Sequence, residues 1–223
     1  MLSRLAGDTT MSTASDARFW DRTSRKYAKA AIADQAGYER TLGRTRALLG
    51  PDDRVLELGC GTGATARQLA GDVQSYFATD ISAEMIAIAE ERRAAGPVPS
   101  SAVFRTATAE ALAPEDGQFD AVLGFNYLHL VRDPPGTLRC IRALLAAEGL
   151  FISKTPCLGD MNPLIRLALL PAMRAIGKAP YVSVFRAAQL SQLICAAGFD
   201  ILATESHATK GNDHRPYIVA RKR

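Results

Sequence analysis

An acidic residue followed by three glycines at alternate positions makes residues 55–63 the most informative stretch of the chain. The order is Val-Leu-Glu-Leu-Gly-Cys-Gly-Thr-Gly, and a helix-forming run follows it. Glycine lets the backbone turn with positive φ and approach a ligand closely, and the first turn of a helix offers unpaired N–H groups. The pattern predicts a loop that holds a flat, polar ligand carrying a carboxylate or a phosphate.

The glycines alone fit two kinds of cofactor. A dinucleotide-binding loop reads Gly-x-Gly-x-x-Gly/Ala, and Gly59, Gly61 and Ala64 satisfy that spacing. The acidic residue that such a loop needs about 20 positions later is present as Asp80. Against this interpretation, Glu57 would set a carboxylate against a diphosphate, and the third glycine would have no role. An NAD(P)-dependent oxidoreductase is therefore the alternative that the loop leaves open.

The wider pattern resembles the motifs of class I S-adenosylmethionine-dependent methyltransferases. Residues 57–63 read Glu-x-Gly-x-Gly-x-Gly, as in their first motif, and residues 80–85 read Asp-Ile-Ser-x-x-Met, as in their second. The resemblance extends over residues 16–222, and the ubiquinone/menaquinone-methyltransferase-like group of small enzymes is the most similar. It implies transfer of a methyl group from S-adenosylmethionine to a small, apolar or lipid-like acceptor. A non-catalytic protein that only binds S-adenosylmethionine is a further alternative.

The same resemblance implies a set of cofactor-binding residues. Asp80 would bind the ribose hydroxyls, while Ile81 and Met85 would enclose the adenine. Thr108 stands where the family commonly has an Asp or Asn that reads the adenine edge. The complete set is Glu57, Gly59, Gly61, Asp80, Ile81, Met85, Thr108, Ala109, Glu110 and Asn126.

Two residues are candidates for catalytic roles. His129 has an unperturbed pKa near neutrality, which suits a general base, although a purely structural histidine is the competing interpretation. A tyrosine at about the position of Tyr27 approaches the sulfonium in the resembling enzymes. Displacement at a sulfonium mainly requires alignment and exclusion of water, so no strong catalytic dyad is expected.

Strands and helices alternate along the chain, which predicts an α/β fold. We expect a Rossmann-like, doubly wound, seven-stranded and mostly parallel sheet, with helices on both faces and a helical N-terminal cap. Strands are predicted at residues 54–58, 75–79, 102–107, 119–124, 149–155, 200–206 and 215–220. Helices are predicted at residues 16–29, 38–49, 62–70, 82–95, 134–146, 163–176 and 186–197. Ligands of such sheets bind at the carboxyl ends of the strands, where the candidate residues fall.

The domain organisation is expected to be simple. Residues 1–15 are rich in Ser, Thr and Gly and are predicted to be disordered, and residues 16–223 form one methyltransferase domain. Residues 16–50 would form the helical cap. Residues 157–184 form a helical lid insertion, a plainly packed helix, or a basic amphipathic stretch in peripheral contact with a membrane.

Composition argues against several other classes of protein. The four cysteines form no Cys-x-x-Cys pair and no histidine stands at ligand spacing, so we expect no metal site and a cytoplasmic protein with reduced thiols. The net charge of +4 is mild, and basic residues in 18–46 alternate with acids, which argues against nucleic acid as a partner. No apolar run reaches the length of a membrane span. The expected state is a monomer or homodimer that acts on a small molecule.

Overall fold

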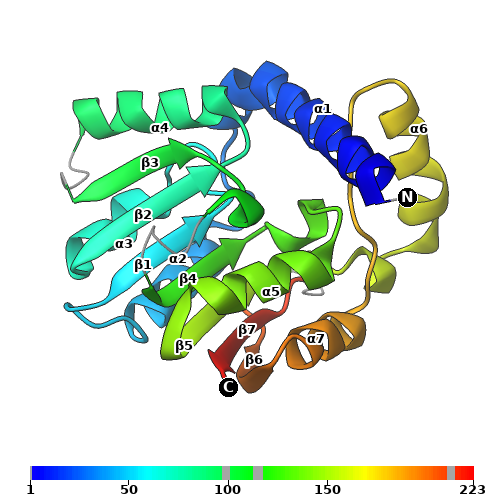
Figure 1. Cartoon of the computed structure of the whole chain (residues 1–223). Coiled ribbons are helices and arrows are strands. Elements are labelled where there is room, and N and C mark those ends of the chain that lie inside the picture. The colour runs from blue at the N-terminus through cyan, green and yellow to red at the C-terminus, as the bar shows by residue number, and fades with distance from the viewer. Residues whose placement is uncertain (1, 97–100, 113–117, 210–213) are drawn as a thin grey trace.

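The computed structural model describes residues 2–96, 101–112, 118–209 and 214–223. Its strands form one seven-stranded sheet in the order β3-β2-β1-β4-β5-β7-β6 (Figure 1). β7 runs antiparallel to both neighbours and every other pairing is parallel, which confirms the predicted sheet. The strands are β1 (Arg54–Leu58), β2 (Ser75–Asp80), β3 (Ala102–Thr106), β4 (Phe119–Phe125), β5 (Leu145–Lys154), β6 (Phe199–Glu205) and β7 (Tyr217–Lys222).

Helices cover both faces of this sheet, as expected for a doubly wound fold. The helices are α1 (Leu2–Lys29), α2 (Gln35–Arg46), α3 (Ala66–Leu69), α4 (Ala83–Ala95), α5 (Pro134–Leu144), α6 (Leu170–Ala175) and α7 (Ala187–Ala196). Side chains of α2, α3 and α4 join the core on one face, and those of α5 and α7 join the core on the other. Val55 and Leu56 of β1 belong to opposite cores, because successive side chains of a strand point to opposite faces.

The order of the strands reverses between β1 and β4, and this reversal locates the ligand crevice. Strands β2 and β3 extend to one side of β1, while β4 and β5 extend to the other. The connections after β1 and β4 therefore diverge and leave an opening at the carboxyl ends of these strands. The glycine loop follows β1 and the segment containing Asn126 follows β4, so the topology brings them to the same edge.

The cap differs from the prediction at both of its helices. Helix α1 begins at Leu2, where residues 1–15 were expected to be disordered. Once residues 16–29 have nucleated a helix, each further residue adds a backbone hydrogen bond, and residues 2–15 contain no proline to stop it. Helix α2 does not cap the site but packs against the sheet, where the Thr45 hydroxyl lies 3.0 Å from the Tyr217 hydroxyl.

Helix α1 crosses the carboxyl end of the sheet and is attached to α4 along its second half (Figure 1). Asp21 accepts a 2.6 Å hydrogen bond from the Ser82 hydroxyl, which lies at the N-cap of α4. One turn later Arg25 forms a two-point ion pair with Glu91, at 2.8 and 2.9 Å. These contacts hold α1 above the edge of the sheet where the cofactor motifs end.

The segment after β5 stands apart from the sheet. A π-helical stretch (Ile165–Leu169) leads into α6, which lies outside the layers of the sheet and its helices (Figure 1). Nearly every described side chain between residues 162 and 178 is exposed. Within the part of the chain that the structure describes, no helix is both long and apolar enough to cross a bilayer.

Candidate cofactor and active site

The loop after β1 depends on its glycines. Gly59, Gly61 and Gly63 have φ angles of 70°, 54° and 73°, in the left-handed region that favours glycine. A Cβ atom on Gly59 would also lie 2.8 Å from a ring carbon of Tyr127. Because Gly59 and Gly61 have no side chains, their backbone atoms line the cavity at the carboxyl end of β1, where a ligand can approach them.

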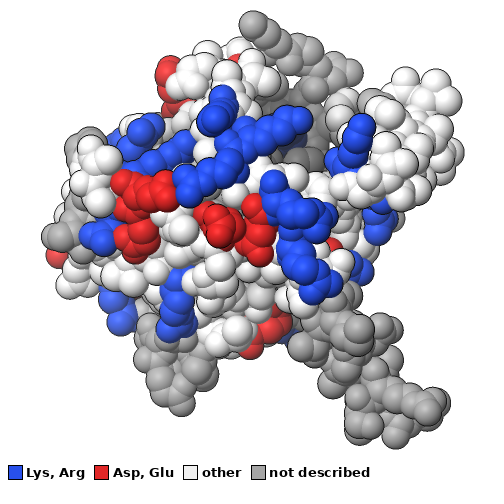
Figure 2. Space-filling model, turned by 90° about the horizontal axis from the view of Figure 1, so that it is seen from above, with Lys and Arg blue, Asp and Glu red and all other residues white. Residues whose placement is uncertain are grey.

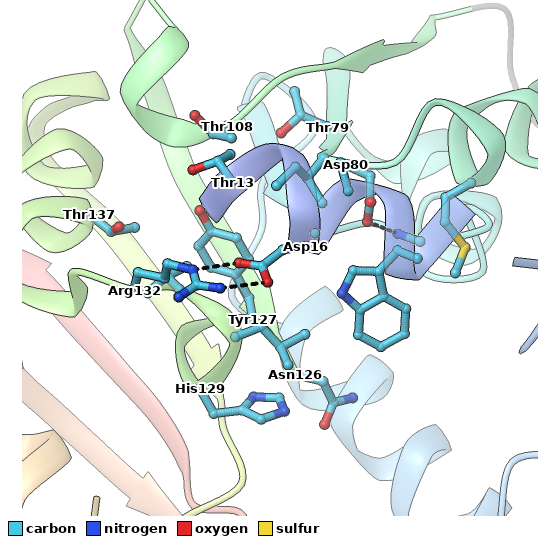
Figure 3. A pocket seen from close by; sticks show the side chains of 18 of the residues that line it. Thr13, Asp16, Thr79, Asp80, Thr108, Asn126, Tyr127, His129, Arg132 and Thr137 are labelled. Atoms are coloured by element: carbon cyan, nitrogen blue, oxygen red, sulfur yellow. Dashed lines mark hydrogen bonds and ion pairs between the residues drawn. The ribbon is translucent and has the colours of Figure 1, made fainter. Parts of the chain in front are cut away.

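Asp80 ends β2 and is held by the neighbouring backbone. Its two carboxylate oxygens accept 2.9 Å hydrogen bonds from the N–H groups of Gly61 and Ser82 (Figure 3). The side chain lines the cavity, and its burial raises the pKa of the carboxyl group. Each oxygen can accept a second hydrogen bond, so the group is arranged to receive two hydroxyls of a ligand.

A cavity of about 1200 Å³ runs along the carboxyl ends of the strands, beneath α1. Thr79, Asp80 and Thr108 lie toward one end of it, and Asn126 and His129 lie at the other (Figure 3). All but two of the predicted site residues line this cavity. Those that line it are Tyr27, Gly59, Gly61, Asp80, Ile81, Met85, Thr108, Glu110, Asn126 and His129.

Glu57 and Ala109 are the two predicted residues that do not line the cavity. Glu57 is 2% exposed and accepts a 2.9 Å hydrogen bond from the Tyr76 hydroxyl, below the glycine loop. Burial raises the pKa of Glu57 to about 7. Ala109 is buried in the core beside α5, because the short turn after β3 points it inward. The Glu57 side chain is therefore placed to support the glycine loop from below rather than to line the cavity, and any contact of Ala109 with a ligand would have to come from its backbone.

The segment after β4 turns sharply at Asn126. This residue has a φ of 52°, a conformation that asparagine tolerates better than most residues, and its N–H donates to the Lys154 carbonyl at 2.8 Å. Non-glycine residues held in this region are concentrated at functional sites. The turn exposes Asn126 to the cavity and aims the following residues along its wall.

His129 lies in that wall and is neutral at physiological pH. Burial is the main cause that lowers the pKa of His129 to about 4, and the positive charge of Arg215 lowers it further. Among the described residues, the buried Nδ1 atom has no hydrogen-bond partner. The backbone carbonyl of His129 accepts from the Ser183 N–H at 2.7 Å, which fixes the position of the residue. A fixed, neutral imidazole on a cavity wall is able to accept a proton.

Tyr27 lies over the glycine loop, at the opposite wall. A Cβ atom on Gly61 would lie 3.7 Å from a ring carbon of Tyr27. The ring is half-exposed and meets Trp20 edge to face, with centroids 6.2 Å apart. Partial burial, together with the carboxylates of Asp80 and Glu57, raises the pKa of the Tyr27 hydroxyl. The hydroxyl therefore stays protonated and able to donate a hydrogen bond.

An ion pair between Asp16 and Arg132 bridges the cavity and was not predicted. The guanidinium donates to both carboxylate oxygens, at 2.8 and 2.9 Å, and thereby joins α1 to the loop after β4 (Figure 3). Arg215, two residues before β7, also lines the cavity and was missed. Arg132 could have been predicted as a site residue, because it comes soon after the carboxyl end of a predicted strand. No local pattern marks Asp16 or Arg215.

The described residues fit a nucleoside-bearing ligand with a charged, amino-acid-like end. The bare glycine backbone can approach the charged end, and the Asp80 carboxylate suits a ribose diol. Ile81 and Met85 supply apolar surface on the same side of the cavity, and a methionine sulfur packs favourably against an aromatic ring. Together with the strand order, this arrangement defines the class I methyltransferase fold. A family model described as a methyltransferase domain matches residues 24–204, and the chain belongs to this family.

Solved structures agree with that assignment at the level of the fold. The DhpI complex with S-adenosylhomocysteine has a TM-score of 0.72 at 22% identity and covers 95% of this chain and 97% of that one. Magnesium protoporphyrin IX methyltransferase from Synechocystis, with S-adenosylhomocysteine bound, has a TM-score of 0.69 at 16% identity, covering 95% and 100%. The predicted resemblance is confirmed, and membership of the family makes S-adenosylmethionine the cofactor.

Curated relatives match over part of their length. An arginine-hydroxylase, mitochondrial NDUFAF5 of Danio rerio, is 32% identical over 156 residues, which are 68% of this chain and 46% of that protein. A ubiquinone biosynthesis O-methyltransferase of Methylocella silvestris is 38% identical over 102 residues, 46% of this chain and 39% of that protein. The chain spans less than half the length of these two relatives.

Proposed function

We propose that this chain transfers the methyl group of S-adenosylmethionine to a hydroxyl of a small, apolar or lipid-like acceptor. The observation that carries the proposal is the continuation of the cavity beyond the cofactor residues. Beyond Asn126 the cavity is lined by apolar side chains together with the neutral His129, the Arg215 guanidinium and the Asp16–Arg132 ion pair. The apolar residues are Phe125, Leu130, Val131 and Pro156.

The size of the cavity supports two ligands. Pockets for a single small molecule measure roughly 300–1,000 Å³, and this cavity holds about 1200 Å³. Asp80 and Thr108, two of the expected cofactor residues, lie toward one end, so the region beyond Asn126 that contains His129 remains for an acceptor. The apolar side chains of that region favour an acceptor with a ring or an alkyl chain.

The chain's own residues supply the proton chemistry of the proposed reaction. When bound, S-adenosylmethionine provides a sulfonium that carries an electrophilic methyl group. His129 would take the proton of the acceptor hydroxyl on its imidazole, and Arg215 would stabilise the oxygen from which that proton leaves. Tyr27 and Trp20 would exclude water above the glycine loop, where alignment contributes most of the rate.

Binding measurements separate this proposal from the oxidoreductase alternative. Titration calorimetry should give a micromolar dissociation constant for S-adenosylhomocysteine and no heat with NADH or NADPH. Tight binding of a nicotinamide cofactor without binding of S-adenosylhomocysteine would refute the proposal.

Turnover measurements separate catalysis from cofactor binding alone. Formation of S-adenosylhomocysteine would be followed with phenols, long-chain alcohols and their O-methylated counterparts, which have no hydroxyl to react. An arginine-containing peptide belongs in the same panel, because one relative is named an arginine-hydroxylase.

We expect His129→Gln to lower kcat at least 100-fold on the best hydroxyl acceptor, within the range for loss of a general base, with an unchanged affinity for S-adenosylhomocysteine. Because the pKa of His129 is about 4, the wild-type rate should not change with the protonation of this group between pH 6 and 8. A variant that keeps the full rate would eliminate His129 as the base, and no product from any acceptor would favour a non-catalytic binding protein.

The proposed location is cytoplasmic. All four cysteines are free thiols in the structure, which supports a reducing compartment. Labelling of native and unfolded protein with a thiol reagent tests this, since a native disulfide would leave fewer than four reactive groups.

A further inference from the structure

The segment around α6 exposes an unusual number of large apolar side chains. Leu164, Leu167 and Ile176 are 71%, 68% and 64% exposed, and Leu169 and Met173 are exposed as well. Single exposed apolar residues are common on protein surfaces, but several in one short segment indicate a contact with something else. No described residue of this segment lines the cavity, so of the three alternatives stated for residues 157–184 the lid is the one that the cavity lining does not support.

The spacing of these residues is that of an amphipathic helix. Leu169, Met173 and Ile176 recur at intervals of four and three, which sets them on one face. Arg174 follows Met173 in α6, and Lys178 comes directly after Gly177, where the helix has ended; both side chains are exposed. The segment thus combines an apolar surface with a basic margin.

Helix α1 adds further basic residues to the same side of the molecule. Arg18, Arg22 and Lys26 are four residues apart and all are exposed. Figure 2, which views the molecule from above Figure 1, shows Lys and Arg in a band across this face, with the mostly white surface of the α6 side at the right. Acidic side chains lie beside the band in Figure 2. On α1 itself, Arg25 is paired with Glu91 of α4.

We propose that residues 164–178 bind the surface of an anionic lipid bilayer. The apolar side chains enter the interfacial region, while Arg174, Lys178 and the bases of α1 face the lipid headgroups. Basic amphipathic helices bind anionic membranes in this way, by apolar burial and electrostatic attraction together. A second copy of the chain is a poorer occupant, since five side chains cannot fill the roughly 800 Å² per partner of a standard interface.

Contacts within the chain connect this surface to the mouth of the cavity. The ring of Tyr181 lies under the guanidinium of Arg132, at 4.3 Å, and also under that of Arg174, at 5.3 Å. The Ser183 hydroxyl donates to the Val131 carbonyl at 2.8 Å. Docking at α6 would therefore hold the mouth of the cavity near the bilayer, from which a lipid-like acceptor can enter. Membrane binding does not depend on the proposed methyl transfer, so either can fail alone.

Co-sedimentation with lipid vesicles tests the proposal without any measurement of activity. The whole chain is mixed with vesicles of phosphatidylcholine alone, or of phosphatidylcholine with a quarter of phosphatidylglycerol. We expect binding to the anionic vesicles, weaker binding to the neutral ones, and a decrease when salt is raised. Failure to sediment with anionic vesicles would overturn the proposal.

Matched pairs of variants distinguish binding through residues 164–178 from non-specific adsorption to lipid. Leu164→Ser with Leu167→Ser should weaken binding at least about tenfold, whereas Leu202→Ser, at an exposed leucine of β6, should not. Each charge removed by Arg174→Gln and Lys178→Gln should cost about fivefold.

The matched charge control removes two exposed bases elsewhere, with Arg67→Gln and Arg139→Gln, and should retain most of the binding. Equal losses in test and control variants would overturn the proposed surface. So would a dimer in solution that the leucine variants dissociate while vesicle binding stays absent, because the segment would then face a second copy.

Discussion

Replacement of Glu57 by glutamine should stabilise the protein in alkaline solution and change little in acid. The side chain is 2% exposed and its only charged neighbour of note is another acid, Asp80. Burial raises the pKa of Glu57 from its ordinary 4.5 to about 7, although the Tyr76 hydroxyl donates to it and opposes the rise. The desolvation of the carboxylate exceeds what the hydroxyls of Tyr76 and Thr65 return.

The direction and size of this change in stability follow from the pKa of Glu57 in the folded and unfolded states. A carboxyl group with a higher pKa in the folded state binds its proton more tightly there, so protonation stabilises the fold. That contribution is fully present below about pH 4.5 and is lost as the pH rises through about 7. The gap between 4.5 and about 7 corresponds to about 3.5 kcal/mol, at about 1.4 kcal/mol per pKa unit. Glutamine cannot ionise and still accepts from Tyr76, so Glu57→Gln avoids the loss.

Urea unfolding at pH 5 and pH 8 measures this difference. Between these two conditions the free energy of unfolding of Glu57→Gln, relative to the wild type, should rise by about 2–3 kcal/mol. Glu39→Gln, an exposed carboxyl on α2, is the control and should show no such trend. If the difference between Glu57→Gln and the wild type is the same at both pH values, the carboxyl is not forced to ionise in a buried site and the reasoning fails.

Two further substitutions test the cofactor end of the cavity. Asp80→Ala should weaken binding of S-adenosylhomocysteine at least tenfold in calorimetry, because hydrogen bonds to a charged group are worth about 1.5–3 kcal/mol, and unchanged affinity would contradict the role of Asp80. Gly59→Ala should destabilise the fold by about 1–3 kcal/mol in urea unfolding, since it combines a positive φ with a clash against Tyr127. Gly43→Ala, in a helix where a new Cβ meets no atom within 4 Å, should instead stabilise by about 0.4–1 kcal/mol, and equal effects at the two glycines would argue against strain in the loop.

The sequence predicted the sheet well because its central strands are mostly apolar runs bounded by turn residues. The apolar character of these strands also made the orientation of the Glu57 side chain impossible to predict. Central parallel strands are buried on both faces, so β1 shows no alternation of polar and apolar residues that would tell which face a side chain meets. Glu57 was predicted to bind the cofactor only because of its position in the motif. In the structure, β1 directs its side chain into the core beside Tyr76.

Contacts between distant parts of the chain were beyond prediction for a different reason. Asp16 and Arg132 are separated by 116 residues, and neither belongs to a pattern that requires the other. The helical state of residues 2–15 likewise depends on nucleation by the residues that follow, not on the local composition of Ser and Thr. The periodicity of a sequence indicates which side of a helix or strand is buried. It does not indicate which distant residue a given side chain will contact.

The methyl donor and the acceptor are expected to contact different parts of the fold. The residues that fit the methyl donor come from the ends of consecutive parallel strands, where the fold itself brings them together. The walls at the opposite end come from α1, the loop after β4 and the segment before β7, through the Asp16–Arg132 ion pair, His129 and Arg215. Changes in those three segments alter the shape and charge offered to an acceptor while the glycine loop and Asp80 stay in place. A shared fold and cofactor are therefore compatible with different acceptors in relatives of this chain, and acceptor choice has to be measured on variants of these segments rather than inferred from the glycine motif.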